Sequence, residues 1–173
     1  MGAIAYHAAP MHTAVPIAES ARGLRVGIAT SRYHDAVTAR LRDGARAAFV
    51  AAGGSDDDLV LVDAPGAYEL VAIARALVSR SDLDAVVCLG CVLTGETRHD
   101  AYICEAVANG LAAISADTGK PVAFGVLTCQ SPEQAEARAG GSKGNKGEEA
   151  MKAAVIAAQA IARVHRLPPG RPA

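Results

Sequence analysis

The sequence is poor in aromatic residues: among 173 residues there is no tryptophan, and aromatic residues make up only 3%. A core without large rings is packed from small aliphatic side chains, which suits helices lying closely on a sheet. Hydrophobic residues make up 51% and charged residues 20% of the chain, so enough apolar surface is present for folding. At this length we expect one folded domain.

Long apolar runs and a strong net charge are also missing. Apolar stretches such as 58–64 and 85–90 are far shorter than the roughly 20 residues of a membrane-spanning helix. The formal net charge is -1, which creates no field that would gather nucleic acid or an anionic membrane. No lysine or arginine precedes Arg22, so the positive segment of a secretory signal is missing. We therefore expect a cytoplasmic protein with neither nucleic acid nor membrane as a partner.

The chain has 4 cysteines, of which Cys88 and Cys91 form a C-x-x-C pattern. Both lie at the end of a strand-like run, where an odd offset directs two side chains to opposite faces of a sheet. A shared metal ion would require the strand to turn. We therefore expect buried, reduced cysteines and no metal site.

Apolar runs alternate with helical periodicity from Leu24 onward. Strands are expected at 24–29, 58–63, 84–90 and 122–127, and helices at about 35–52, 67–77, 99–118, 132–139 and 147–164. Strands separated by helices pair in parallel through right-handed crossovers. The pattern predicts an α/β fold, a three-layer α/β/α sandwich with a central four-stranded parallel sheet. Residues 23–167 are expected to form the single domain, 1–22 an extended or disordered N-terminal arm and 168–173 a C-terminal tail.

Ligands bind at the carboxyl ends of the strands in such open sheets, and the loop 90–100 has suitable chemistry. It combines glycines and threonines with His99, directly before a helix. Free N–H groups of a first helical turn favour an anion, so the main chain at Glu96, Thr97 and Arg98 is a candidate phosphate cradle. An imidazole there suits proton transfer near neutral pH, and a solvent-exposed surface histidine is the alternative.

Two further sets of residues lie near strand ends. Arg138 and Lys146 flank a glycine-rich segment that lacks the spacing of a nucleoside-triphosphate loop. This segment is either a solvated basic turn or a ligand for a single phosphate, because arginine can bind two phosphate oxygens. Tyr33, Tyr68 and Phe124 either pack in the core or offer faces on which a flat heterocycle can stack.

Five segments, in this order and spacing, resemble the lumazine synthase family over about 24–164. They are 31–35, 65–69, 90–99, 124–128, and 138–140 together with 144–147. The resemblance implies a flavodoxin-like fold and a transferase of riboflavin biosynthesis. That enzyme condenses 5-amino-6-(D-ribitylamino)uracil with 3,4-dihydroxy-2-butanone 4-phosphate to give 6,7-dimethyl-8-ribityllumazine. No cofactor and no metal is implied.

The resemblance also implies residue roles. His99 corresponds to the proton-transfer residue and Arg138 to the phosphate-binding arginine, with the main chain of Glu96 and Thr97 as the remaining cradle and Lys146 as an additional charge. Tyr33 takes the place of the aromatic residue that stacks on the pyrimidine. The other substrate contacts correspond to Ala67, Tyr68 and Glu69 for the ribityl chain, to Cys91, Val92 and Leu93 through their backbone, and to Phe124 across a subunit interface.

Two positions depart from the family pattern. Asp100 and Ala101 follow His99 where an aromatic residue is usual, and His34 stands where asparagine is common. Asp100 either raises the pKa of His99 or caps the following helix, and we favour the cap.

Family members share active sites between subunits of a pentamer, and some assemble into 60-subunit icosahedral shells. We therefore expect at least a pentamer, and the short segment between Arg138 and Gly147 favours the shell. The N-terminal arm is a candidate for adding a strand to a neighbour's sheet. The principal alternative is a non-catalytic or weakly active paralogue that binds lumazine or riboflavin or serves as a shell. An archaeal-type riboflavin synthase and a generic flavodoxin-like module are further alternatives.

Overall fold

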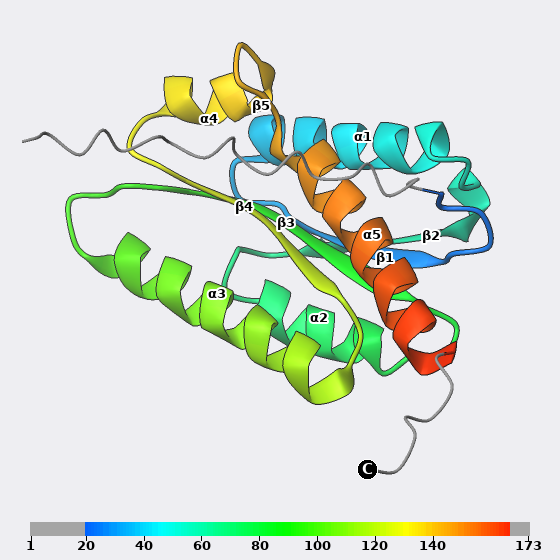
Figure 1. Cartoon of the computed structure of the whole chain (residues 1–173). Helices are drawn as coiled ribbons and strands as arrows, with labels where there is room; N and C mark the ends of the chain where they lie inside the picture. The colour runs from blue at the N-terminus through cyan, green and yellow to red at the C-terminus, as the bar shows by residue number, and fades with distance from the viewer. Residues whose placement is uncertain (1–19, 167–173) are drawn as a thin grey trace, which may run out of the picture.

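The computed structural model describes residues 20–166, which form a parallel sheet between two layers of helices (Figure 1). The strands are β1 (Val26–Ser31), β2 (Leu59–Ala64), β3 (Ala85–Leu93) and β4 (Val122–Cys129). Their order across the sheet is β2-β1-β3-β4, and all neighbours are parallel. The predicted three-layer α/β/α sandwich with a flavodoxin-like four-stranded sheet is confirmed. Of the expected terminal segments, 1–19 and 167–173 lie outside the described residues.

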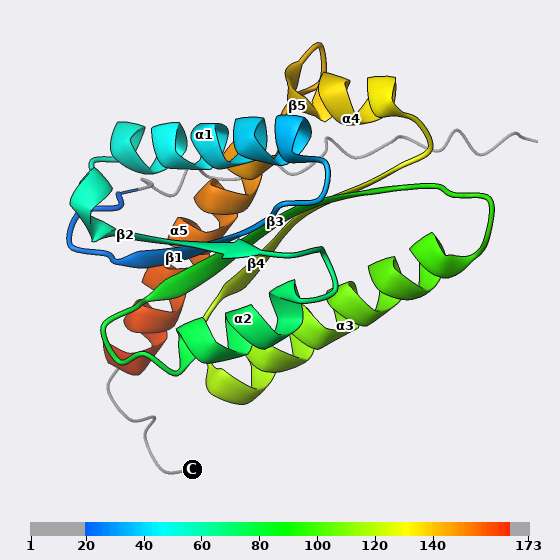
Figure 2. The ribbon, with the colours of Figure 1, turned by 180° about the vertical axis from the view of Figure 1, so that it is seen from behind.

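Helices cover both faces of the sheet (Figures 1 and 2). On one side lie α1 (Asp35–Ala51) and α5 (Lys146–Arg166), with the short α4 (Pro132–Arg138) beyond the end of β4; on the other lie α2 (Leu70–Val78) and α3 (His99–Thr118). A 3-10 turn, η1 (Asp56–Asp58), precedes β2. Between α4 and α5, β5 (Ala139–Gly141) and β6 (Gly144–Asn145) pair antiparallel.

Successive side chains along each strand point to opposite faces of the sheet, so the protein has two hydrophobic cores, one on each face. Val87 and Leu89 of β3 face α1 and α5, where they join the core that contains Phe49, whereas Val86 faces α2 and α3 and joins the core around Leu111. The same alternation places Cys88 and Cys91 in different cores, and all four cysteines are free thiols. The expected opposite orientation of the C-x-x-C pair is therefore confirmed.

β3 is longer than the sequence predicts. The sequence predicts a strand that ends at Gly90, but β3 continues to Leu93 because β4 pairs with it up to the register pair Leu93 and Cys129. A β-carbon at Gly90 would lie 3.3 Å from side-chain atoms of Leu70 and Val126. This glycine therefore serves close packing rather than strand termination.

Two other boundaries also differ from expectation. The glycine-rich segment that was read as a loop forms the β5–β6 hairpin, in which positive φ angles at Gly140 (93°) and Gly144 (80°) turn the chain. Helix α2 begins at Leu70 rather than near Ala67, because residues 67–69 form a turn in which the Leu70 N–H donates to the Ala67 carbonyl. This turn becomes part of the site described below.

Exposed ion pairs lie at the amino end of the sheet. Asp82 accepts hydrogen bonds from Arg25 Nη1 at 2.6 Å and from Arg80 Nη2 at 2.8 Å. The hydrogen bond from Arg80 is the largest cause that lowers the pKa of Asp82 below its ordinary value of 3.8. Because the fold prefers the carboxylate, the stabilisation is complete above pH 3.8 and is lost as the pH falls further.

We therefore expect Asp82→Asn to lower the melting temperature by a few degrees at pH 7 and by less at pH 3, since exposed ion pairs contribute little. Thermal unfolding followed by circular dichroism at the two pH values measures the difference. Asp117→Asn is the matched control, because Asp117 is exposed and has no ion pair within residues 20–166. An equal fall in the melting temperature of Asp82→Asn at both pH values would contradict the predicted dependence of stability on the ionisation of Asp82.

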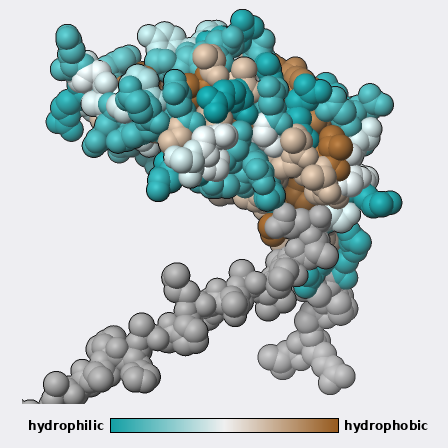
Figure 3. All heavy atoms as spheres, turned by 90° about the horizontal axis from the view of Figure 1, so that it is seen from above, coloured by the Kyte–Doolittle hydropathy of each residue, from teal (hydrophilic) through white to brown (hydrophobic). Residues whose placement is uncertain are grey.

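Hydrophilic side chains cover most of the face shown in Figure 3, and the apolar groups gather toward one side. Within residues 20–166, no helix combines the length and the apolar character needed to cross a membrane.

Candidate functional site

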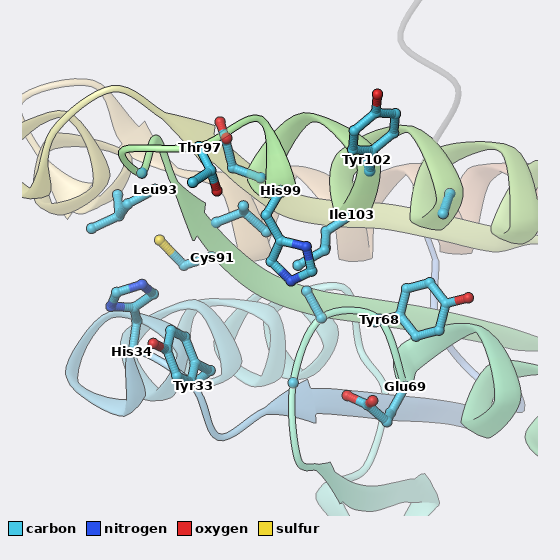
Figure 4. Close-up of a pocket in the computed structure, with 16 residues that line it drawn as sticks. Tyr33, His34, Tyr68, Glu69, Cys91, Leu93, Thr97, His99, Tyr102 and Ile103 are labelled. Carbon is cyan, nitrogen blue, oxygen red and sulfur yellow. The ribbon is translucent and has the colours of Figure 1, made fainter.

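A cavity of about 930 Å³ opens at the carboxyl ends of β1, β2 and β3 (Figure 4). Its walls come from the start of α1, the turn before α2, the end of β3 and the first turns of α3. The cavity therefore lies where ligands bind in open parallel sheets. Nine of the predicted site residues line it: Tyr33, Ala67, Tyr68, Glu69, Cys91, Val92, Leu93, Thr97 and His99.

The end of β3 presents backbone groups to this cavity. β1 pairs with β3 only as far as Leu89, whereas β4 pairs with it to Leu93. The segment 90–93 therefore has sheet hydrogen bonds on its β4 side and an edge free of β1 on the other side. Peptide N–H and C=O groups along such an edge can bind the polar rim of a ligand.

His99 is the first residue of α3, and its imidazole points into the cavity (Figure 4). The ring is exposed and makes no hydrogen bond or ion pair within residues 20–166. It is therefore free to exchange a proton with a bound molecule. The expected cap by Asp100 is wrong: α3 has Arg98 at its N-cap and no side-chain cap hydrogen bond. Asp100 instead lies in the first turn, where its charge is favourable to the helix dipole.

Aromatic side chains with exposed faces gather at the cavity. The exposed fractions are 67% for Tyr33, 60% for Tyr68 and 63% for Tyr102, and all three residues line the cavity. Core packing, the alternative for Tyr33 and Tyr68, is therefore excluded. Exposed rings around a cavity offer stacking surfaces for a flat molecule.

Several lining residues were missed by the sequence analysis. Tyr102, Ile103 and Ala106 lie three, four and seven positions after His99 and share its cavity-facing side of α3. This helical spacing is a signal that the sequence contained, because positions three and four apart lie on one face of a helix. The guanidinium of Arg98 also lies over the Tyr102 ring, 5.8 Å from its centroid.

His34 also lines the cavity and has an unusual backbone. Its φ of 60° and ψ of 46° place it in the left-handed region, the only residue other than glycine with positive φ within 20–166. Histidine, like asparagine, adopts this region more readily than most residues. The ring contacts Tyr33 edge to face, with centroids 4.8 Å apart. The departure at position 34 therefore places a second imidazole in the cavity wall.

Four predicted site residues lie outside the lining of this cavity: Glu96, Phe124, Arg138 and Lys146. Glu96 is exposed and, like Thr97, lies in the loop before α3 rather than in its first turn, because the helix begins at His99 with Arg98 as its N-cap. Phe124 projects from the edge strand β4 with 38% of its surface exposed. Lys146 Nζ forms an exposed ion pair with Glu149 at 2.7 Å. The proposed contacts of all four residues stay predictions.

Arg138 ends α4 and is exposed, with no ion pair within residues 20–166. Its charge acts on the Cys129 thiol, whose pKa burial raises and Arg138 lowers. The Cys129 carbonyl accepts a hydrogen bond from Thr94 N at 2.9 Å. Arg138 therefore lies near the point where the end of β4 joins the loop that leads to His99.

The cysteines near the site have little thiolate character. Burial raises the pKa of Cys88 to about 12 and is the main cause that raises that of Cys91 to about 11. No cluster of His, Cys, Asp and Glu within residues 20–166 is arranged to hold a metal ion. The thiols therefore contribute to packing and to the cavity wall.

We expect iodoacetamide at pH 8 to leave Cys88 unmodified in the folded protein, because this side chain is fully buried. The half-buried Cys104 is expected to react first. Peptide mass spectrometry after a timed reaction measures both sites, and unfolding in urea should make all four thiols reactive. Modification of Cys88 at the rate of Cys104 in the folded state would contradict this expectation.

Together the fold and the cavity define a class of protein: a parallel α/β/α sandwich with a small-molecule-sized cavity at the carboxyl ends of its strands, lined by exposed tyrosines and an exposed histidine. A family model described as 6,7-dimethyl-8-ribityllumazine synthase matches residues 23–162.

Two relatives that carry this name support the match. The one from Thermus thermophilus is 41% identical over 147 residues, which cover 85% of this chain and 94% of the relative. The one from Syntrophus aciditrophicus is 44% identical over 135 residues, which cover 78% and 88%. The chain belongs to the 6,7-dimethyl-8-ribityllumazine synthase family.

Proposed function

We propose that this chain condenses 5-amino-6-(D-ribitylamino)uracil with 3,4-dihydroxy-2-butanone 4-phosphate to 6,7-dimethyl-8-ribityllumazine, with loss of phosphate and water. The observation that carries the proposal is that the family match over 23–162 includes every residue lining the cavity. The exposed aromatic faces and free backbone edge of this cavity suit a flat heterocycle with polar substituents.

The lining of the cavity supports an assignment of each part of the pyrimidine substrate to a part of the wall. Tyr33 stacks on the pyrimidine, and the free edge at 90–93 hydrogen-bonds its polar rim. The turn before α2, with Tyr68 and Glu69, receives the ribityl chain, because it lines the wall next to Tyr33 and carries a carboxylate that accepts hydrogen bonds from hydroxyl groups.

His99 has the proton-transfer role. The amine of the pyrimidine attacks the ketone carbon to form an imine, and water leaves. Phosphate is then eliminated, and closure of the second ring releases another water. Each step moves a proton between nitrogen, carbon and oxygen, and the free imidazole at the start of α3 can accept and return it.

The phosphate binds between the start of α3 in one copy of the chain and Arg138 of a neighbouring copy. The free N–H groups of the first turn of α3, which begins at His99, and the helix dipole favour an anion next to the preceding residues Glu96 and Thr97. Arg138 supplies a guanidinium that can bind two phosphate oxygens and has no competing carboxylate within residues 20–166.

Phe124 and Arg138 complete the site of a neighbouring copy in a ring-shaped homo-oligomer, a pentamer that can assemble into a 60-subunit shell. This proposal is supported by the exposure of both residues and by their position outside the chain's own cavity.

We expect His99→Ala and Arg138→Ala chains, refolded together, to regain activity. In a 1:1 ring, about a quarter of shared sites would combine an intact His99 with an intact Arg138. Activity no higher than the average of the two separate variants would contradict shared sites.

Purified protein incubated with both substrates tests the function directly. We expect the fluorescence of the lumazine to appear together with one equivalent of free phosphate, and neither signal when one substrate is omitted. Binding of the pyrimidine or of lumazine without phosphate release in a single-turnover experiment would contradict catalysis and favour the ligand-binding paralogue.

A further inference from the structure

The side-chain amide of Asn145 joins the hairpin, α5 and α1. Its Oδ1 accepts hydrogen bonds from Gly147 N at 2.8 Å and from Glu148 N at 3.3 Å, so it caps the first turn of α5. Its Nδ2 donates at 2.9 Å to the carbonyl of Arg40, which lies 105 positions earlier in α1. Both ends of one amide are therefore used, one for a cap and the other for a contact between distant segments.

Glycines make room for this contact. A β-carbon at Gly44, in the middle of α1, would overlap the amide of Asn145, and one at Gly147 would overlap the backbone of Leu41. Glycine inside a helix is unfavourable compared with alanine, so its presence at position 44 fits a requirement for space. The start of α5 therefore docks directly on α1, with the Asn145 amide between them.

The docked amide also fixes the segment that carries Arg138. Asn145 pairs with Ala139 across the hairpin, and Ala139 is buried. The N–H of Lys143 donates to the carbonyl of Ala137 at 2.8 Å, which closes the hairpin against the end of α4. Arg138 lies between these two contacts, so its backbone position depends on where the hairpin lies relative to α1.

We propose that Asn145 is a positioning residue for Arg138, and that its bond to the Arg40 carbonyl sets the guanidinium at the phosphate end of the site. The inference rests on the proposed function, because it acts through the phosphate contact of Arg138. It gives the segment 144–147, for which the sequence predicts either a solvated basic turn or a phosphate ligand, a different role. The amide at position 145 holds the arginine in place, and the neighbouring Lys146 forms an exposed ion pair with Glu149.

Asn145→Ser separates this role from simple helix capping. Serine is an equally good N-cap residue, but its side chain is too short to reach the Arg40 carbonyl. Gly44→Ala approaches the same contact from the other side, since it keeps the amide and fills its space. For both variants we expect the KM for butanone phosphate to rise by about 10-fold, while kcat and the KM for the pyrimidine change by less than about 2-fold.

A double-mutant cycle gives the decisive readout. Because Asn145 acts through Arg138, Asn145→Ser should add nothing to the KM for butanone phosphate when Arg138 is already alanine. Ser142→Ala, in the exposed turn of the same hairpin, is the matched control and should leave every kinetic parameter unchanged. Circular dichroism checks that each variant is folded at the assay temperature.

The inference is overturned if both variants keep the native KM for butanone phosphate, or if Asn145→Ser raises this KM equally with and without Arg138. Either result leaves the proposed function intact, because the native protein would still form lumazine. An unchanged KM in Arg138→Ala alone would instead contradict the phosphate role of Arg138, and the inference with it. Absence of lumazine from the native protein would contradict the proposed function itself.

Discussion

His99→Ala is expected to lower kcat by about 10- to 1000-fold, the range over which a general acid or base contributes to a reaction. The imidazole points into the cavity from the first residue of α3 and has no protein partner within residues 20–166. Its removal therefore breaks no hydrogen bond within the protein, so the loss of kcat reflects the loss of proton transfer. Both KM values should change far less than kcat, because binding is assigned to the aromatic faces, the free strand edge and Arg138.

His165→Ala is the matched control, since His165 is an exposed histidine in the last turn of α5 and does not line the cavity. It should retain native kcat and native KM values. Steady-state lumazine formation measures the three parameters, and single-turnover phosphate release shows whether the chemical steps are slowed. A His99→Ala enzyme with native kcat would contradict the proton-transfer role.

Arg138→Ala is expected to raise the KM for butanone phosphate by about 10- to 100-fold, because a hydrogen-bonded charge pair is lost. The KM for the pyrimidine should stay near its native value, since no atom of that substrate is assigned to Arg138. Arg138→Lys keeps the charge but loses the two-pronged geometry, so its KM should lie between those of the native protein and Arg138→Ala.

Arg163→Ala serves as the matched control for charge, because Arg163 is exposed on α5 and does not line the cavity. Initial rates with each substrate varied in turn separate the two KM values, and inhibition by inorganic phosphate gives an independent measure of the anion site. We expect this inhibition to weaken in Arg138→Ala and to be unchanged in Arg163→Ala. Equal increases in both KM values would contradict a phosphate contact.

The layers of the fold follow from local pattern. Short apolar runs separated by helical periodicity identify the strands and the crossover helices, and the alternation of facing residues predicts the opposite orientation of Cys88 and Cys91, confirmed by their places in different cores. The pattern did not predict two features, the extension of β3 and the β5–β6 hairpin, because both depend on contacts between residues distant in sequence. β3 passes Gly90 because β4 continues beside it, and no property of 90–93 alone shows this. The hairpin at 139–145 lacks apolar alternation, so it is visible only in the folded chain.

The cavity was predicted in a similar manner. Nine predicted site residues line the cavity. Tyr33, Tyr68, Thr97 and His99 were identified because parallel strand ends meet at one edge of the sheet, whereas the other five were identified only through the family resemblance, namely Ala67, Glu69, Cys91, Val92 and Leu93. Tyr102 was missed although its spacing from His99 indicates a shared helix face. The left-handed backbone of His34 has no comparable local signal in the sequence. Phe124 and Arg138 are exposed and lie outside the cavity lining, so their predicted contacts depend on the neighbouring copy that we propose.

The segment of β3 that runs beyond β1 has a consequence for how the site tolerates change. Under the proposed function, a flat heterocycle along 90–93 would take the place of a further strand and would hydrogen-bond to peptide groups, which every amino acid supplies. Side chains at Val92 and Leu93 can then vary in identity, provided that they preserve the strand, without altering the recognised pattern of donors and acceptors. Ligand selectivity at this edge would then depend on how far β3 extends beyond β1, in addition to the side chains that line the cavity.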